Sequence, residues 1–332
     1  MYALLGISVT FAFLLLVNMA VAVFASTFWN IISNRVHDLS PIAQAHIIFT
    51  LRILPVVAAL IFVSAFLVPS YLLLEPDSSG EVVSIKMAVL STLSIIGVLL
   101  ALFRVFETWL ATRRLTSNWL GSAAEIRLNN ISIPVFRIQH QFPVIAVIGI
   151  FRPKMFVAEQ VLASLDENEF IAAIAHEYGH LKANDNFKRT ILRVCRDLLI
   201  LPFGKGLDRA WAENAEALAD EFAATTGRST ALDLASALVK IARIVPRNAC
   251  PSMPAGTFLI DEQNVDITTR VRRLVRLSEG QGIVRQPRLL GFSTAVWLWS
   301  AALVALLILP LIDQRFLSST HEAVEQFVRI LQ

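Results

Sequence analysis

Two histidines and a glutamate stand together in an otherwise apolar stretch of this chain. His176, Glu177 and His180 belong to FIAAIAHEYGHLKANDN, residues 170–186. Residues four apart lie on one face of a helix, so the two imidazoles can reach the same metal ion. Zinc accepts imidazole nitrogens and keeps one position open in catalytic sites. The H-E-x-x-H spacing therefore predicts a zinc site in which Glu177 takes a proton from water as general base.

A catalytic zinc site needs a third protein ligand. The segment WAENAEALADEFAATTG, residues 211–227, places Glu213, Glu216 and Asp220 on one helix face. Such an acidic stripe is often solvated, but alanines, a tryptophan and a phenylalanine surround this one, and buried carboxylates require a partner. We predict Glu216 as the third ligand and Asp220 as the side chain that orients a histidine N–H. Glu213 is the alternative ligand.

Other elements must position these groups. Ser164 followed by Glu167 has the spacing of a capping box and predicts the start of the histidine helix. Gly179, between the histidines, would let another backbone approach closely. Segments rich in Ile and Val predict three strands upstream, at residues 131–137, 144–151 and 154–157. An exposed edge of such a sheet could bind an extended peptide.

The composition indicates a membrane protein rather than a soluble one. Of the 332 residues, 55% are hydrophobic and 17% are charged. A bilayer core about 30 Å thick needs a helix of about 20 apolar residues. Four runs predict transmembrane helices, at residues 1–29, 53–74, 87–106 and 289–312. The first run has no positively charged start and is longer than the apolar core of a usual signal peptide, so we expect it to be retained.

The distribution of lysine and arginine predicts the orientation of the spans. The link between the second and third spans is acidic, with no basic residue before Lys86. Four arginines accompany the end of the third span: Arg104, Arg113, Arg114 and Arg127. Region 110–288 is therefore expected in the cytoplasm, and both termini outside the inner membrane. The net charge of +3 follows from these inner-face residues, and no array of basic and aromatic residues indicates direct nucleic-acid binding.

Three further segments carry weaker signals. Cys195 and Cys250 fall in the region assigned to the cytoplasm and are expected to be reduced and structural. Residues 240–275 contain three prolines and predict either a lid or a disordered loop. The tail at 313–332 predicts an amphipathic helix on the outer surface. Its expected apolar side consists of Phe316, Val324, Phe327 and Ile330.

Four sequence elements together resemble the BlaR/MecR antirepressor family of membrane metallopeptidases and, more distantly, the HtpX family. They are VIGIFRPKMFVAE, HEYGHLKANDN, EALAD and TRVRRLVR. The resemblance implies the ligand role for Glu216 and the supporting role for Asp220, and it implies three spans, a protease domain and a fourth span. The antirepressors continue into an extracellular penicillin-binding sensor, whereas the tail after Asp313 is too short for one, so a β-lactam signal is not expected.

The sequence thus predicts a polytopic membrane protein, mainly α, with four transmembrane helices and an α+β zinc metalloprotease domain between spans three and four. One Zn²⁺ per chain would serve hydrolysis of a cytoplasmic or juxtamembrane polypeptide. The resemblance implies a transcriptional repressor or the protease itself as substrate, with a separate sensor protein as a further partner. Two alternatives remain: a catalytically silent membrane scaffold, or a transporter that uses polar span residues such as Asn18 and Ser64.

Overall fold

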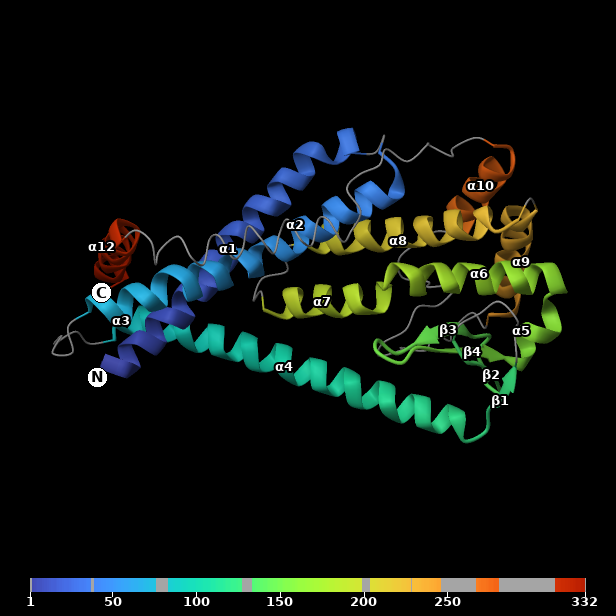
Figure 1. Cartoon of the computed structure of the whole chain (residues 1–332), viewed down its shortest axis with the longest axis horizontal. Coiled ribbons are helices and arrows are strands. Elements are labelled where there is room, and N and C mark those ends of the chain that lie inside the picture. Colours follow the sequence, from blue (N-terminus) through green and yellow to red (C-terminus); the bar gives the residue numbers. More distant parts are fainter. Residues whose placement is uncertain are drawn as a thin grey trace.

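The computed structural model describes most of the chain and has an elongated shape (Figure 1). Two long helices occupy one end, a small sheet covered by shorter helices occupies the other, and a third long helix, residues 85–120, runs from the first end to the sheet. The described residues are 2–36, 39–75, 83–126, 133–198, 204–227, 229–245, 267–280 and 314–331.

Three long helices have the length and apolar composition needed to cross a membrane. The first is α1 (Tyr2–Val36) and the last is α4 (Ile85–Leu120). Between them, α2 (Pro41–Ile61), the π-helical η1 (Phe62–Leu67) and α3 (Val68–Leu74) follow one another without a break. The prediction of three apolar spans in this part of the chain is confirmed, and the predicted fourth span at 289–312 lies outside the described residues.

Each of these helices extends beyond the apolar run that predicted it. The second helix begins at Pro41, although the apolar run begins only at Ile53. Its first half includes Arg52, which is 2% exposed because its Nε contacts Asp208 at 2.7 Å. A polar side chain with a partner does not interrupt a helix, because backbone bonds hold the helix together. The first residue of the apolar run therefore did not predict the first residue of the helix.

A mixed four-stranded sheet lies at the other end of the molecule, in the order β1-β2-β4-β3. Its strands are β1 (Ala124–Ile126), β2 (Val135–Ile138), β3 (Ile145–Ile148) and β4 (Lys154–Ala158). The β2–β4 pair is parallel and the other two pairs are antiparallel. The last three strands match the predicted ones with shifted bounds, and β1 was not predicted. Strand β3 ends early because Gly149 has φ 104°, which turns the chain.

Among the described residues, six helices complete this end of the molecule. They are α5 (Glu159–Ser164), α6 (Glu167–Ala183), α7 (Asp185–Asp197), α8 (Lys205–Thr225), α9 (Thr230–Ile244) and α10 (Ile267–Ser278). Helix α6 lies between the sheet and α8 (Figure 1). Strands β2 to β4 pack with α6, α9 and α10 around one apolar core. Helix α6 is therefore packed against the sheet on one side and against α8 on the other.

The predicted start of the histidine helix was wrong by two residues. Its N-cap is Asp166, whose carboxylate accepts a bond from the Glu169 N–H, while the Glu169 side chain accepts one from the Asp166 N–H. Ser164 instead ends α5, and its hydroxyl donates to the Val161 carbonyl. Both pairs have the spacing of a capping box, but only Asp166 follows an extended residue, which lets a new helix begin.

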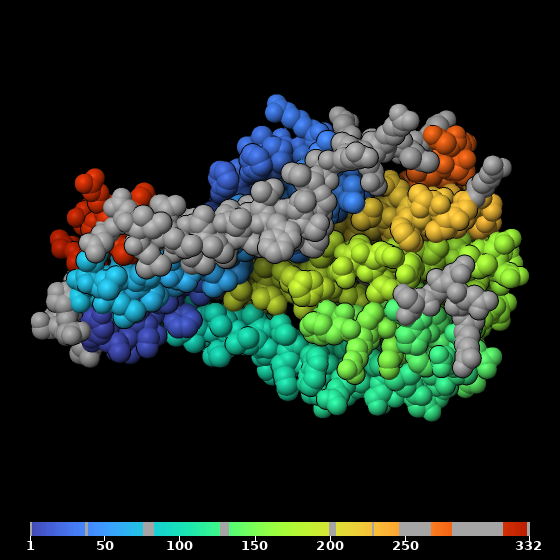
Figure 2. All heavy atoms as spheres, viewed as in Figure 1, coloured from blue at the N-terminus to red at the C-terminus, as the bar shows by residue number. Residues whose placement is uncertain are grey.

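The tail forms the helix α12 (Gln314–Leu331), which packs on η1 and α3 at the end of the long helices. Figure 2 shows α12 in red at one end and α10 in orange at the other. The predicted helix is confirmed, and Val324 of its predicted apolar side is buried. The rest of the buried side differs: Leu317 and Val328 are buried, whereas Phe316 and Ile330 are exposed.

Candidate metal centre

Helix α6 carries the three motif residues into the interior. His176 and Glu177 are 0% exposed and His180 is 2% exposed. Gly179 lies between them where α6 crosses α8, and a Cβ added to it would be 3.1 Å from the Cα of Ala219. The absence of a side chain therefore lets the two helices approach, as the sequence predicted.

Glu216 on α8 lies opposite both histidines. Its Oε2 is 3.5 Å from Nε2 of His176, and its Oε1 is 3.5 Å from Nε2 of His180. One ligand atom from each of the three residues lies within 4.8 Å of the others. The ligand atoms of a tetrahedral zinc ion are separated by about 3.3 Å when each bond is about 2.0–2.1 Å long. The three side chains could therefore hold such an ion with small adjustments.

A buried nitrogen supports this fit. Nε2 of His180 is buried and has no hydrogen-bond partner among the residues that the structure describes. A buried polar atom without a partner costs free energy, and a metal ion would satisfy it.

Each histidine also has a carboxylate on its other nitrogen. Nδ1 of His176 is 3.0 Å from Oδ1 of Asp220, and Nδ1 of His180 is 2.7 Å from Oδ2 of Asp185. Asp185 begins α7 directly after Asn184, whose φ of 56° turns the chain between the two helices. A hydrogen bond at Nδ1 orients the ring and leaves Nε2 for a metal. The structure thus places Asp220 where a histidine-orienting side chain was predicted.

Arg270 on α10 is a site residue that the sequence analysis missed. Its guanidinium lies 2.7 Å from Oδ1 of Asp220 and 3.1 Å from Oε2 of Glu216. It belongs to the region predicted as a lid or loop, although residues 230–244 and 267–278 are helical. The spacing of apolar residues could have identified Arg270. It lies four and seven residues before Leu274 and Leu277, which are both buried, so a helix would place it on the same buried face.

The charges of the cluster reinforce one another. Burial disfavours the carboxylate of Glu216, yet His180 and Arg270 hold its pKa well below the usual value. Burial also opposes protonation of His180, but Glu216 and Asp185 raise its pKa to about 10.

The alternative ligand lies elsewhere. Glu213 points outward on α8, with its side chain 46% exposed and paired with Arg209 at 2.9 Å.

Cys195 is a buried residue of α7 and forms no disulfide with a described residue, and Cys250 lies outside the described residues. Burial raises the pKa of the Cys195 thiol to about 11, so it stays protonated and unreactive.

The part of the chain that builds this centre has known relatives. Residues 145–238 match the model of peptidase family M48. The M48-like segment runs from β3 into α9 and contains His176, His180 and Glu216, but it covers less than a third of the 332 residues. A search of curated proteins found no match. Together with the three apolar helices, the segment indicates a membrane-associated metallopeptidase.

Proposed function

We propose that this chain is an integral-membrane zinc endopeptidase that hydrolyses a peptide bond within a polypeptide. One observation carries the proposal: inside the M48-like segment, His176, His180 and Glu216 converge on a buried point beside Glu177. Two imidazoles and one carboxylate form a ligand set that zinc hydrolases use, with one position left open.

The side chains divide the work of hydrolysis. A zinc ion bound here would lower the pKa of a water molecule, polarise the scissile carbonyl and stabilise the oxyanion. Glu177 takes the proton from the attacking water and later passes it to the leaving amine. Asp220 and Asp185 keep the two imidazoles oriented through Nδ1. Arg270 balances the charge of Glu216 and Asp220, which burial would otherwise disfavour.

The sheet supports a polypeptide substrate. Strand β3 is an edge strand and contacts α6. The carbonyl of Val144, the residue before β3, accepts a bond from the Ala158 N–H at 2.8 Å. Because backbone groups alternate in an antiparallel ladder, Ile145 and Val147 direct theirs away from β4. An extended peptide could add to this edge beside the zinc ligands.

Asn186 limits where such a peptide could pair. Its side-chain amide donates to the carbonyls of Val147 at 3.0 Å and Gly149 at 3.1 Å. A substrate strand would therefore pair with the Ile145 end of β3, and Asn186 would mark the end of the binding edge.

Substrate entry requires a change in this conformation. The side chains of His176, Glu177, His180 and Glu216 are each at most 5% exposed. A polypeptide can reach Glu177 only when covering segments move, so we propose that opening of the site controls activity.

The setting in the cell follows from the charge pattern and the resemblance. We place the active site on the cytoplasmic face of the inner membrane, with a fourth span at 289–312 and both termini outside. The acidic link after Glu75 and the arginines near the end of α4 support this orientation. A transcriptional repressor or the protease itself is the proposed substrate, and a separate protein would supply the signal.

The decisive experiment compares three purified chains in detergent: wild type, Glu216→Ala and Glu177→Gln. Bound zinc is measured by elemental analysis, and cleavage is measured on an unfolded protein such as casein. We expect wild type and Glu177→Gln to hold one more zinc per chain than Glu216→Ala. Only wild type should cleave, with Glu177→Gln slower by about 10²–10⁴-fold.

A different result would favour the silent scaffold. In that outcome, the purified wild-type chain binds zinc but does not cleave the test protein. In addition, cells that carry Glu177→Gln behave like cells that carry the wild-type chain. Absence of the Glu216-dependent zinc would contradict the metal centre itself.

A further inference from the structure

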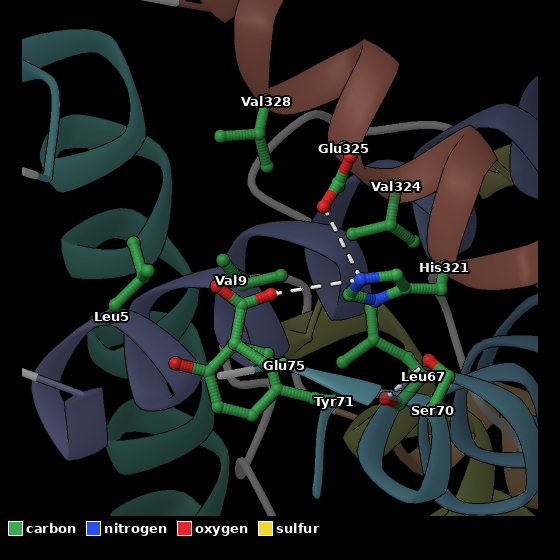
Figure 3. A pocket seen from close by; sticks show the side chains of 10 residues that line it. All are labelled: Leu5, Val9, Leu67, Ser70, Tyr71, Glu75, His321, Val324, Glu325 and Val328. Atoms are coloured by element: carbon green, nitrogen blue, oxygen red, sulfur yellow. Dashed lines mark hydrogen bonds and ion pairs between the residues drawn. The ribbon is translucent and has the colours of Figure 1, made fainter. Parts of the chain in front are cut away.

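A second group of metal-ligating side chains lies at the opposite end of the long helices (Figures 1 and 3). His321 and Glu325 stand one turn apart on α12, and Glu75 is the C-cap residue of α3. Nε2 of His321 is 3.2 Å from Oε1 of Glu325 and 3.8 Å from Oε2 of Glu75. Figure 3 shows both carboxylates directed at the same imidazole nitrogen.

The spacing of these atoms is close to that of a bound ion. Ligand atoms around a tetrahedral zinc ion are separated by about 3.3 Å. The Glu325 oxygen already lies 3.2 Å from the imidazole nitrogen, and the Glu75 oxygen lies at 3.8 Å. The three ligand atoms are all within 4.8 Å of one another. Small side-chain rotations would therefore complete three metal bonds without moving either helix.

The burial of the Glu75 carboxylate favours a bound cation at this site. The Glu75 side chain is only 8% exposed, and among the described residues its only ion-pair partner is His321. The three side chains line a cavity whose other walls are Ser70, Tyr71 and five apolar side chains: Leu5, Val9, Leu67, Val324 and Val328. A carboxylate in such surroundings costs free energy unless a positive charge compensates it.

The cavity also has room for a further ligand. The space open to the centre of a water-sized sphere is about 20 Å³. A single buried water needs about 10–15 Å³ by this measure. Oε2 of Glu325 contacts Arg329 at 3.3 Å, so that carboxylate is held with its other oxygen toward His321.

We propose that Glu75, His321 and Glu325 bind a divalent transition-metal ion of the zinc class, at a site separate from the centre in α6 and α8. One imidazole and two carboxylates suit zinc, whereas calcium and magnesium prefer oxygen ligands alone. Because its ligands come from α3 and α12, the ion would fasten the tail helix to the end of the second long helix. The proposal does not depend on the peptidase activity.

The test counts zinc in the full chain, purified in detergent with a tag that contains no histidine. The protein is stripped with a chelator, equilibrated with buffered free Zn²⁺ and analysed for zinc per chain. We expect two for wild type, one for His321→Ala, one for Glu216→Ala and none for the double variant. Glu325→Gln, which preserves the shape of the side chain, should also hold one.

Glu322 provides the matched control, because it is an exposed carboxylate on α12 next to His321. Glu322→Gln should hold two zinc ions. If it loses as much zinc as Glu325→Gln, the binding reflects surface charge and the proposal is overturned. If His321→Ala fails to fold, the Glu325→Gln variant decides.

The design separates the two metal sites. Wild type holding one zinc that depends on Glu216 but not on His321 would overturn this proposal and leave the peptidase proposal intact. The reverse dependence would overturn the peptidase site alone. Hydrogen exchange provides a measurement that does not depend on counting zinc. Exchange of the backbone amides of α12 should slow when Zn²⁺ is added to wild type, and it should not change in His321→Ala.

Discussion

His176 and His180 share part of their contacts in the candidate metal centre. In each ring Nδ1 faces an aspartate, and Nε2 faces Glu216. The aspartates come from different helices, α8 and α7, and His176 alone also contacts Arg270, whose Nη2 is 3.3 Å from Nε2. The planes of the two rings meet at 88°, which lets both Nε2 atoms point at one location without the rings colliding. Metal affinity at this site therefore depends on residues that would not touch the ion.

Replacement of Asp220 by Asn tests this dependence. An amide oxygen is a weaker hydrogen-bond acceptor for the His176 ring N–H than a carboxylate, so we expect zinc affinity to fall by about 10–100-fold. Competition with a fluorescent zinc chelator would measure the change. Glu221→Gln is the matched control, since the neighbouring Glu221 pairs with Arg273 and is 28% exposed. Equal loss in both variants would contradict the assigned role of Asp220.

The contact between α6 and α8 depends on a residue with no side chain. A Cβ at Gly179 would meet the Ala219 Cα at 3.1 Å and the Phe222 Cβ at 3.3 Å. We predict that Gly179→Ala separates the two helices, lowering both the melting temperature and the zinc affinity. Gly206→Ala on α8 is the control, because nothing lies within 4 Å of its added Cβ. In that variant the better helix propensity of alanine should leave stability unchanged or raise it.

Helix α6 is also joined to α9 by a buried carboxylate. Glu169 accepts bonds from Ser236 and Lys240, each at 2.6 Å, besides its capping bond to Asp166. Burial alone would raise its pKa, but the Lys240 ammonium and these hydrogen bonds lower it below the usual 4.5. The ionised form is thus stabilised in the folded state.

This pKa shift predicts a pH-dependent stability. A carboxylate whose pKa is depressed by folding contributes stability above its unfolded pKa, and that contribution is lost as the pH falls through the folded value. Glu169→Gln should therefore melt at a lower temperature than wild type at pH 7, and the difference should shrink below pH 4.5. Exposed Glu167, replaced by Gln, provides the comparison. A difference independent of pH would exclude the mechanism.

At the scale of the molecule, the long helices and the metal centre are mechanically joined. The first half of α2 packs on α7 and α8 through an apolar cluster that includes Ile48, Leu207 and Trp211. Within this interface Arg52 pairs with Asp208 in the first turn of α8, the helix that carries Glu216. Gly204 lies against the guanidinium, where an added Cβ would be 3.1 Å from Nε. We therefore expect a displacement of α2 to move the helix that carries Glu216.

Removal of Arg52 tests this junction. Arg52→Ala would leave Asp208, whose side chain is 23% exposed, without its partner. Loss of one member of a fully buried pair costs about 3–5 kcal/mol, and partial solvation of Asp208 lowers that cost. We expect a clear drop in melting temperature in detergent. The control is Arg209→Ala, whose pair with Glu213 is 71% and 46% exposed and should contribute less than about 1 kcal/mol. Similar melting temperatures for the two variants would show that the junction carries no stability.

The sequence alone predicted the features that depend on local geometry. The i, i+4 spacing of His176 and His180 already places both on one helix face, because the helical repeat is the same in every protein. Of the four apolar runs, the three that lie in described residues correctly predicted long helices, because bilayer thickness sets the length that a span requires. Both inferences needed only neighbouring residues.

Only the tertiary structure decided the features that depend on how helices meet. Glu213 and Glu216 have equally good spacing in the sequence, but packing of α8 on α6 buries Glu216 and leaves Glu213 exposed. Arg270 is distant in sequence from every residue it contacts in the centre, so no local pattern identifies its partners. Likewise, Glu75 and His321 meet because α12 packs on α3. Contacts between segments remote in sequence are fixed by the packing of the whole chain, which local spacing does not encode.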